Sequence, residues 1–151
     1  INANIDTYSQ NIIISQIELL LNYSERFYNR QFITRKKGNH KILSQLEAFL
    51  NDYFSSDNSI NKGLPTVQMV AQSLNVSANY LSSVLKSLTG LNTRQHIHEK
   101  LIELAKEKLS ATNLTVSEVA FDLGFEHVQS FNKLFKTKTN LSPLEFRANF
   151  N

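Results

Sequence analysis

The sequence predicts an all-α fold in which two similar pairs of short helices are joined by a long connecting helix. Only four glycines and two prolines occur among 151 residues, too few for the turns of a many-stranded sheet. Apolar residues recur at steps of three and four along much of the chain, which is the periodicity of helices. Part of the C-terminal half is also repeated within the chain, which indicates a duplicated structural unit.

The N-terminal residues 1–62 are predicted to form a helical linker or dimerisation segment ahead of a second domain at residues 63–151. Residues 8–33 have a helical pattern, and residues 12–21 are apolar on nearly every face. A helix of this kind has to be covered on all sides. Its cover is the next helix, a second copy of the chain, or a domain that lies outside this sequence.

A break in the helical pattern is expected at the basic run Arg35-Lys36-Lys37-Gly38. Asn39 is then expected to cap a second helix that ends near Phe54, because seven apolar residues follow it in one stripe. Residues 55–63 are small, polar and without pattern, so they are the expected linker.

Short helices with recognisable caps are expected after Pro65. Thr66 can cap the first of them, Gly90 can end the second, and Pro143 suits the first turn of the last. The expected helices lie at about residues 66–73, 77 or 78 to 89, 93–110, 115 or 117 to 123, and 127–138, with a final one from Ser142. The helix at 93–110 is long and amphipathic, and it connects the others.

Two segments of the C-terminal half align with each other. Residues 81–91 match residues 131–141 at a constant offset of 50, apolar position against apolar position. A glycine of the first copy is met by Asn140, which also accepts a left-handed backbone at low cost. Residues 70–74 match residues 119–123 at an offset of 49, so the second turn is one residue longer.

Each copy has the pattern of a helix-turn-helix unit. An alanine of the first helix allows close approach, a tight turn follows, and the second helix buries Leu81 or Phe131 against the first. A duplicated helical hairpin with no role in DNA binding is the alternative interpretation.

These residues resemble the DNA-binding domain of the AraC/XylS family of bacterial transcription regulators. The resemblance covers about residues 64–149 and is densest at residues 116–125, 130–136 and 141–147. Asn140 departs from the family pattern, in which glycine is usual. The resemblance implies two helix-turn-helix units on a rigid connecting helix, and an N-terminal ligand-binding or dimerising domain in many members. Residues 1–60 look like the helical segment that would join a missing sensor domain to the DNA-binding domain.

The function predicted on this basis is sequence-specific binding of double-stranded promoter or operator DNA. Recognition helices at about 78–89 and 127–138 would enter successive major grooves on one face, roughly 34 Å apart. The predicted base contacts are Asn79, Ser82, Ser83, His127, Val128, Gln129, Asn132 and Lys133. The predicted phosphate contacts are Tyr80, Lys86, Lys136 and Lys138. For His127 the alternative is that it only caps its helix.

Other classes of protein receive little support. A net charge of +3 permits binding to a polyanion without demanding it. Cysteine is absent, and His96 and His98 are two residues apart, so they point to different faces of a helix. We therefore expect no metal, no cofactor and no enzymatic activity. No apolar stretch is long enough to span a membrane and no signal peptide is visible, so the expected location is cytoplasmic and nucleoid-associated.

The expected partners besides DNA are a second copy through residues 8–54, a sensor domain upstream of Ile1, and the transcription machinery. Because the first residue is not methionine, the sequence is expected to be a fragment of a longer chain or a processed chain. The alternative function is a helical protein-interaction or dimerisation module without specific DNA binding. It explains residues 1–60 but leaves the repeat unexplained.

Overall fold

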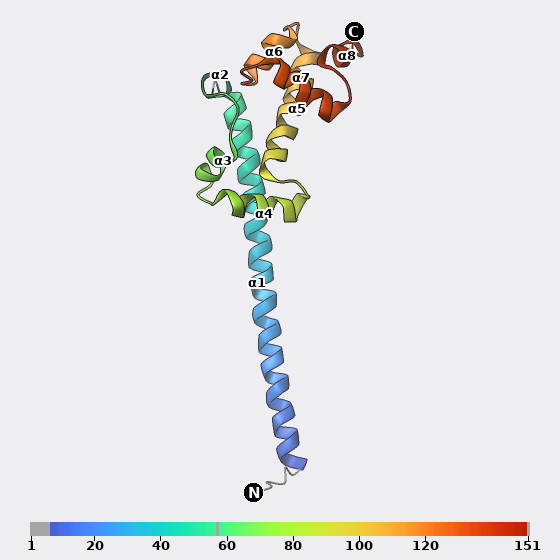
Figure 1. Ribbon diagram of the computed structural model, residues 1–151. Helices are drawn as coiled ribbons and strands as arrows, with labels where there is room; N and C mark the ends of the chain where they lie inside the picture. The colour runs from blue at the N-terminus through green and yellow to red at the C-terminus, as the bar shows by residue number, and fades with distance from the viewer. Residues whose placement is uncertain (1–6, 57, 151) are drawn as a thin grey trace. The chain divides into compact units, whose positions relative to one another are not determined.

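Eight helices and no strand make up the part of the chain that the structure describes (Figure 1). The computed structural model describes the backbone of residues 7–56 and 58–150, and the side chains of these residues except 7, 8 and 29–37. The helices are α1 (Thr7–Ser55), α2 (Asn58–Lys62), α3 (Val67–Ser73), α4 (Ala78–Thr89), α5 (Thr93–Ala111), α6 (Val116–Asp122), α7 (Val128–Thr139) and α8 (Pro143–Ala148). The predicted all-α fold is confirmed.

Helix α1 corrects two expectations about the N-terminal segment. It runs without interruption from Thr7 to Ser55, so the break expected at Arg35-Lys36-Lys37-Gly38 and the cap expected at Asn39 are both wrong. Arginine and lysine are good helix formers, and one glycine inside a helix costs only about 1 kcal/mol relative to alanine. Without a proline nearby, Gly38 alone does not end the helix.

Packing divides the chain into two units, residues 1–39 and residues 40–151. In the first unit, the described part of α1 carries ten large apolar side chains that are 45% to 66% exposed. These are Ile12, Ile13, Ile14, Ile17, Leu19, Leu20, Leu21, Tyr23, Phe27 and Tyr28. These exposed side chains agree with the expectation that the segment needs cover by another surface.

The second unit starts upstream of the boundary that was predicted between residues 62 and 63. From α1 it takes Ile42, Leu46 and Leu50, all buried in the same core as the helices of the repeat. The expected linker at residues 55–63 contains the short helix α2, whose Ser59 is buried. The packing places the last turns of α1 with the C-terminal helices. The predicted division of function at residue 62 stays a prediction.

Helix α5 is central to the second unit. Figure 1 shows α4 beside the start of α5, whereas α6, α7 and α8 gather around its other end. Its buried side chains are Thr93, Ile97, Leu101, Ile102, Ala105 and Leu109. At its C-terminal end, Arg147 Nε of α8 donates a hydrogen bond of 3.1 Å to the Leu109 carbonyl oxygen. A cation at a helix C-terminus is favoured by the helix dipole, so Arg147 holds α8 against the end of α5.

No helix in the described part of the chain combines the length and apolar character that crossing a membrane requires.

Candidate nucleic-acid interface

The first unit of the repeat is formed by α3, a tight turn and α4. Thr66 caps α3 by accepting a 3.2 Å hydrogen bond from the Met69 amide, and Ser77 caps α4 in the same way through Tyr80. The turn reverses at Asn75, whose φ is 56°. Leu81, in the second turn of α4, is fully buried. Local caps and one large apolar side chain therefore fix how α4 leaves the turn.

The second helix-turn-helix unit of the repeat has the same construction in α6, the following turn and α7. Thr115 and Glu118 form a capping box at the start of α6. The chain reverses at Gly124, whose φ is 91°, and α7 begins after His127. Phe131 is 1% exposed, and its ring centroid lies 5.4 Å from that of Phe125 and 5.8 Å from that of Phe135. Aromatic packing thus takes the place of the leucines of the first unit.

The two turns share the same hydrogen bonds. Val76 donates from its amide to the Ala71 carbonyl oxygen at 3.0 Å, and Phe125 donates to the Ala120 carbonyl oxygen at 3.0 Å. Both alanines are buried, Ala71 at 1% and Ala120 at 0% exposure, as the close approach of two helices requires. The predicted duplication of a helix-turn-helix is confirmed at the level of individual hydrogen bonds.

The duplication continues past the end of the aligned segments. Within those segments, Gly90 and Asn140 both end their helices with a left-handed backbone, at φ 78° and 61°. Asn92 and Ser142 then open the next helices with capping boxes. The start of α5 is thus equivalent to the start of α8. The offset of 50 applied to the caps would have revealed this equivalence from the sequence.

The predicted contacts of the first unit lie mainly on the exposed face of α4. Asn79, Tyr80, Ser83 and Lys86 are all exposed. Ser82 differs, because its hydroxyl is 2.9 Å from that of the buried Thr93 and its side chain is half-buried. The structure therefore ties Ser82 to α5, and the remaining three polar side chains and the tyrosine form the exposed surface of α4.

The predicted contacts of the second unit lie on α7. Gln129, Asn132 and Lys133 are exposed near its start, and Lys136 is exposed one turn later. Val128 is half-buried and packs against the core. Ser130 is exposed beside Gln129 and corresponds to Tyr80 at the offset of 50. Sequence reasoning passed over Ser130, although the same offset would have identified it.

Two further predicted contacts have a changed setting. Within the described part of the chain, the imidazole of His127 makes no capping hydrogen bond, so His127 does not act through its side chain as a cap. Lys138 is bound to Glu99 of α5, with 2.7 Å between Nζ and Oε1. Its charge is therefore partly neutralised before any DNA arrives.

The two histidines of α5, His96 and His98, are half-buried. His96 Nε2 lies 2.8 Å from the Thr89 hydroxyl. Burial lowers the pKa of His96, and burial together with the neighbouring Lys138 and Arg94 lowers that of His98. Among the described residues, no group of three or more histidine, aspartate or glutamate side chains is placed to hold a metal ion.

Comparison with known proteins adds a family to this geometry. Residues 70–149 match the family described as helix-turn-helix domain. An uncharacterised helix-turn-helix-type transcriptional regulator of Bacillus subtilis strain 168, YfiF, is 26% identical over 140 residues, which are 93% of this chain. This chain spans only 41% of the length of that relative.

Two solved structures are similar to the chain. The C-terminal domain of AraT, a response regulator from Geobacillus stearothermophilus, gives a TM-score of 0.62 at 28% identity, over 72% of this chain and 84% of that one. The DNA-binding domain of the global transcriptional factor AdpA gives a TM-score of 0.61 at 20% identity, over 72% and 91%, and shares the fold. The expected resemblance to AraC-type DNA-binding domains is confirmed, and DNA binding in transcription regulation is the function of these helix-turn-helix proteins. The chain belongs to the helix-turn-helix domain family and has the AraC-type arrangement of two such units.

Proposed function

We propose that the chain is the DNA-reading part of a longer transcription regulator, and that α4 and α7 both read bases. The observation that carries this proposal is the equivalence of the two units, each of which presents exposed polar side chains on its second helix. A helix of this size fits the major groove, where base pairs differ in their donors and acceptors. AdpA, which has the same fold, was solved in complex with a target DNA.

Base reading is assigned to the exposed side chains near the starts of the two helices. Asn79 of α4 and Gln129 of α7 suit adenine, and Lys133 suits guanine. Ser83 and Asn132 lie on the same exposed faces. Ser82 and Val128 are assigned smaller roles, because one is bonded to Thr93 and the other packs on the core.

Phosphate contacts are assigned to the exposed lysines later in each helix, Lys86 and Lys136, together with Tyr80. Lys138 would contribute only after its ion pair with Glu99 opens. Such contacts set the register of the protein on the duplex without reading sequence. Because one chain carries both units, the site is asymmetric and spans about two helical turns, or roughly 20 base pairs.

A second proposal concerns the part of α1 that lies within residues 1–39. Ile13, Ile17, Leu20 and Phe27 of α1 occupy four of the five seam positions of a heptad repeat over residues 13–27, and Ser24 occupies the fifth. Only three charged residues occur between positions 9 and 28. We assign this face to a second copy of the chain. Residues 42–54 are excluded from the seam because their apolar side chains belong to the core of the second unit, so the dimer contact is shorter than the 8–54 first expected.

Three finer points also remain proposals: a sensor domain in the full protein, contact with the transcription machinery, and a cytoplasmic location on the nucleoid. No catalytic role is proposed. The alternative function, an interaction module without specific DNA binding, is favoured only by the exposed apolar face of the first unit.

The decisive experiment is selection of binders from a randomised duplex pool. The intact chain is compared with an Asn132→Ala/Lys133→Ala variant and with an Asn51→Ala/Lys106→Ala control, which removes the same side-chain types from exposed positions elsewhere. We expect an asymmetric motif of two blocks about one helical turn apart. The first variant should lose information in one block only, and the control in neither. Absence of any motif would leave only phosphate binding and would contradict base reading.

A further inference from the structure

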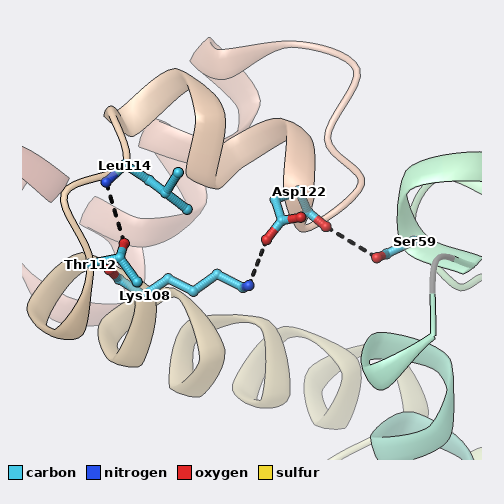
Figure 2. A network of polar contacts seen from close by, with 5 residues as sticks. All are labelled: Ser59, Lys108, Thr112, Leu114 and Asp122. Carbon is cyan, nitrogen blue, oxygen red and sulfur yellow. Dashed lines mark hydrogen bonds and ion pairs between the residues drawn. The ribbon is translucent and has the colours of Figure 1, made fainter.

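The segment expected to be a flexible linker is folded onto the second helix-turn-helix unit. Helix α2 packs against α6, and its Ser59 is 4% exposed. The Ser59 hydroxyl donates a hydrogen bond of 3.1 Å to the Asp122 carbonyl oxygen at the end of α6 (Figure 2). Because Asp122 is the last residue of α6, this contact is made where the turn begins.

The turn itself touches the backbone of α2. Gly124 is buried, and a Cβ at that position would lie 2.7 Å from the Ser59 carbonyl oxygen and 2.9 Å from the Gly63 carbonyl carbon. Real Cβ atoms do not come so close to backbone atoms. The two chain segments thus meet at a distance that only glycine permits.

Both sides of this contact are anchored to other helices. On the α2 side, the hydroxyl of the buried Tyr53 of α1 donates to the Gly63 carbonyl oxygen at 2.9 Å. On the α6 side, Lys108 of α5 forms an ion pair with the Asp122 carboxylate (Figure 2). Asp122 is therefore held through its carbonyl by α2 and through its carboxylate by α5.

Among the residues that the structure describes, the first helix-turn-helix unit has no equivalent cover at the same position. Ser73 and Asn75 correspond to Asp122 and Gly124 at the offset of 49, and both are exposed. The two units are otherwise alike down to the hydrogen bonds of their turns. Cover by α2 is thus a specific addition to the second unit and not a requirement of the helix-turn-helix itself.

We propose that α2 positions the second recognition helix relative to the first, and so sets the spacing between the two DNA blocks that the chain accepts. Ser59 and Asp122 are positioning residues, because they touch no DNA in this scheme and act through the turn. Helix α7 begins four residues after Gly124, so a small rotation at the turn is carried directly into its reading face. This inference rests on the proposed function, in which both helices read bases.

The test is the affinity of the full chain for duplexes in which the selected two blocks are separated by the best spacing or by one base pair more or fewer. Ser59→Ala removes the hydroxyl that reaches Asp122. Ser44→Ala is the matched control, because its exposed hydroxyl donates to the His40 carbonyl oxygen of its own helix. We expect discrimination between spacings to fall about threefold to tenfold in Ser59→Ala, the range for loss of one hydrogen bond, and to stay unchanged in the control.

A second measurement needs no DNA. Amide hydrogen exchange of Gly124 and Phe125 should become about threefold to tenfold faster in Ser59→Ala, while Asn75 and Val76 serve as internal controls in the equivalent turn and stay unchanged. Unchanged spacing discrimination overturns the proposal, whether or not exchange responds. If the unmodified chain selects no two-block site, the proposed function fails, and the exchange data then show separately whether α2 restrains the turn.

Discussion

Asn75 and Gly124 occupy equivalent positions in the turns of the two helix-turn-helix units, and both have a positive φ, of 56° and 91°. Asn75 is nevertheless exposed, whereas Gly124 is buried against α2. The turn alone requires a residue that tolerates a left-handed backbone, and asparagine meets that need. The close approach of Ser59 and Gly63 adds a second requirement, which only glycine meets. The two positions therefore differ in what they tolerate.

Gly124→Ala is expected to destabilise the chain by about 2–4 kcal/mol, because backbone strain and overpacking against α2 add together. Asn75→Ala introduces strain without a clash, so a loss of only about 1 kcal/mol is expected. The free energy of unfolding in urea measures both. Equal losses at the two positions would contradict the role assigned to α2.

The two glutamates of the capping boxes should give the chain a sensitivity to acid. Glu118 and Glu145 each accept a 2.6 Å hydrogen bond from the amide of the capping residue, Thr115 or Ser142. These hydrogen bonds hold the pKa of both carboxyls below their usual range. A pKa that is lower in the folded state stabilises the fold above the ordinary glutamate pKa of about 4.3, and this stabilisation is lost as the pH falls through the folded value.

We therefore expect the urea midpoint to fall between about pH 5 and pH 3, and to fall less in a Glu118→Gln/Glu145→Gln variant. Glutamine keeps an oxygen that can accept the capping hydrogen bond but has no proton to gain. The control is Glu107→Gln/Glu126→Gln, which alters two exposed carboxylates outside the capping boxes. An acid response equal to that of the unmodified chain in the first variant would disprove the assignment.

Much of the fold of residues 40–151 could be predicted from sequence, because its signals are local. Caps such as Thr66 and Ser77, and left-handed ends such as Gly90 and Asn140, are decided by a few neighbouring residues. The spacing of buried and exposed positions then places Leu81 and Phe131 inward. Most of the predicted contacts on α4 and α7 are accordingly exposed.

The features that sequence missed depend on contacts distant along the chain. From the sequence, Ser82 is predicted to be an exposed serine, because nothing local shows that the fold brings Thr93, 11 residues later, beside it. Residues 55–63 read as a linker, since nothing local shows that Ser59 will meet Asp122, 63 residues away. The break expected near Gly38 is wrong for a local reason, because the good helix formers around Gly38 outweigh the cost of one glycine.

Lys136 and Lys133 should respond differently to the same truncation. Lys136→Ala removes a phosphate contact, so the slope of log affinity against log salt should decrease in magnitude by about 1 with the preferred sequence unchanged. Lys133→Ala removes a base contact, so preference at one base pair should weaken by about 1–3 kcal/mol. Fluorescence anisotropy over a salt series and a set of single-base changes measures both. A changed sequence preference in Lys136→Ala would assign it to the bases instead.

The exposed face of α1 should mediate association of two chains. Ile17→Lys/Leu20→Lys places four charges in the proposed seam of each dimer, where four apolar side chains worth about 1.5–3 kcal/mol each were buried. The dissociation constant of the dimer should therefore increase at least about a hundredfold.

Sedimentation equilibrium measures this change in the full chain. The control is Ser15→Lys/Asn22→Lys, which adds the same charges at exposed positions on the opposite side of the seam and should leave the dimer intact. A monomeric unmodified chain would contradict the proposal. Equal loss in both variants would instead show that charge alone, and not the seam at Ile17 and Leu20, controls association.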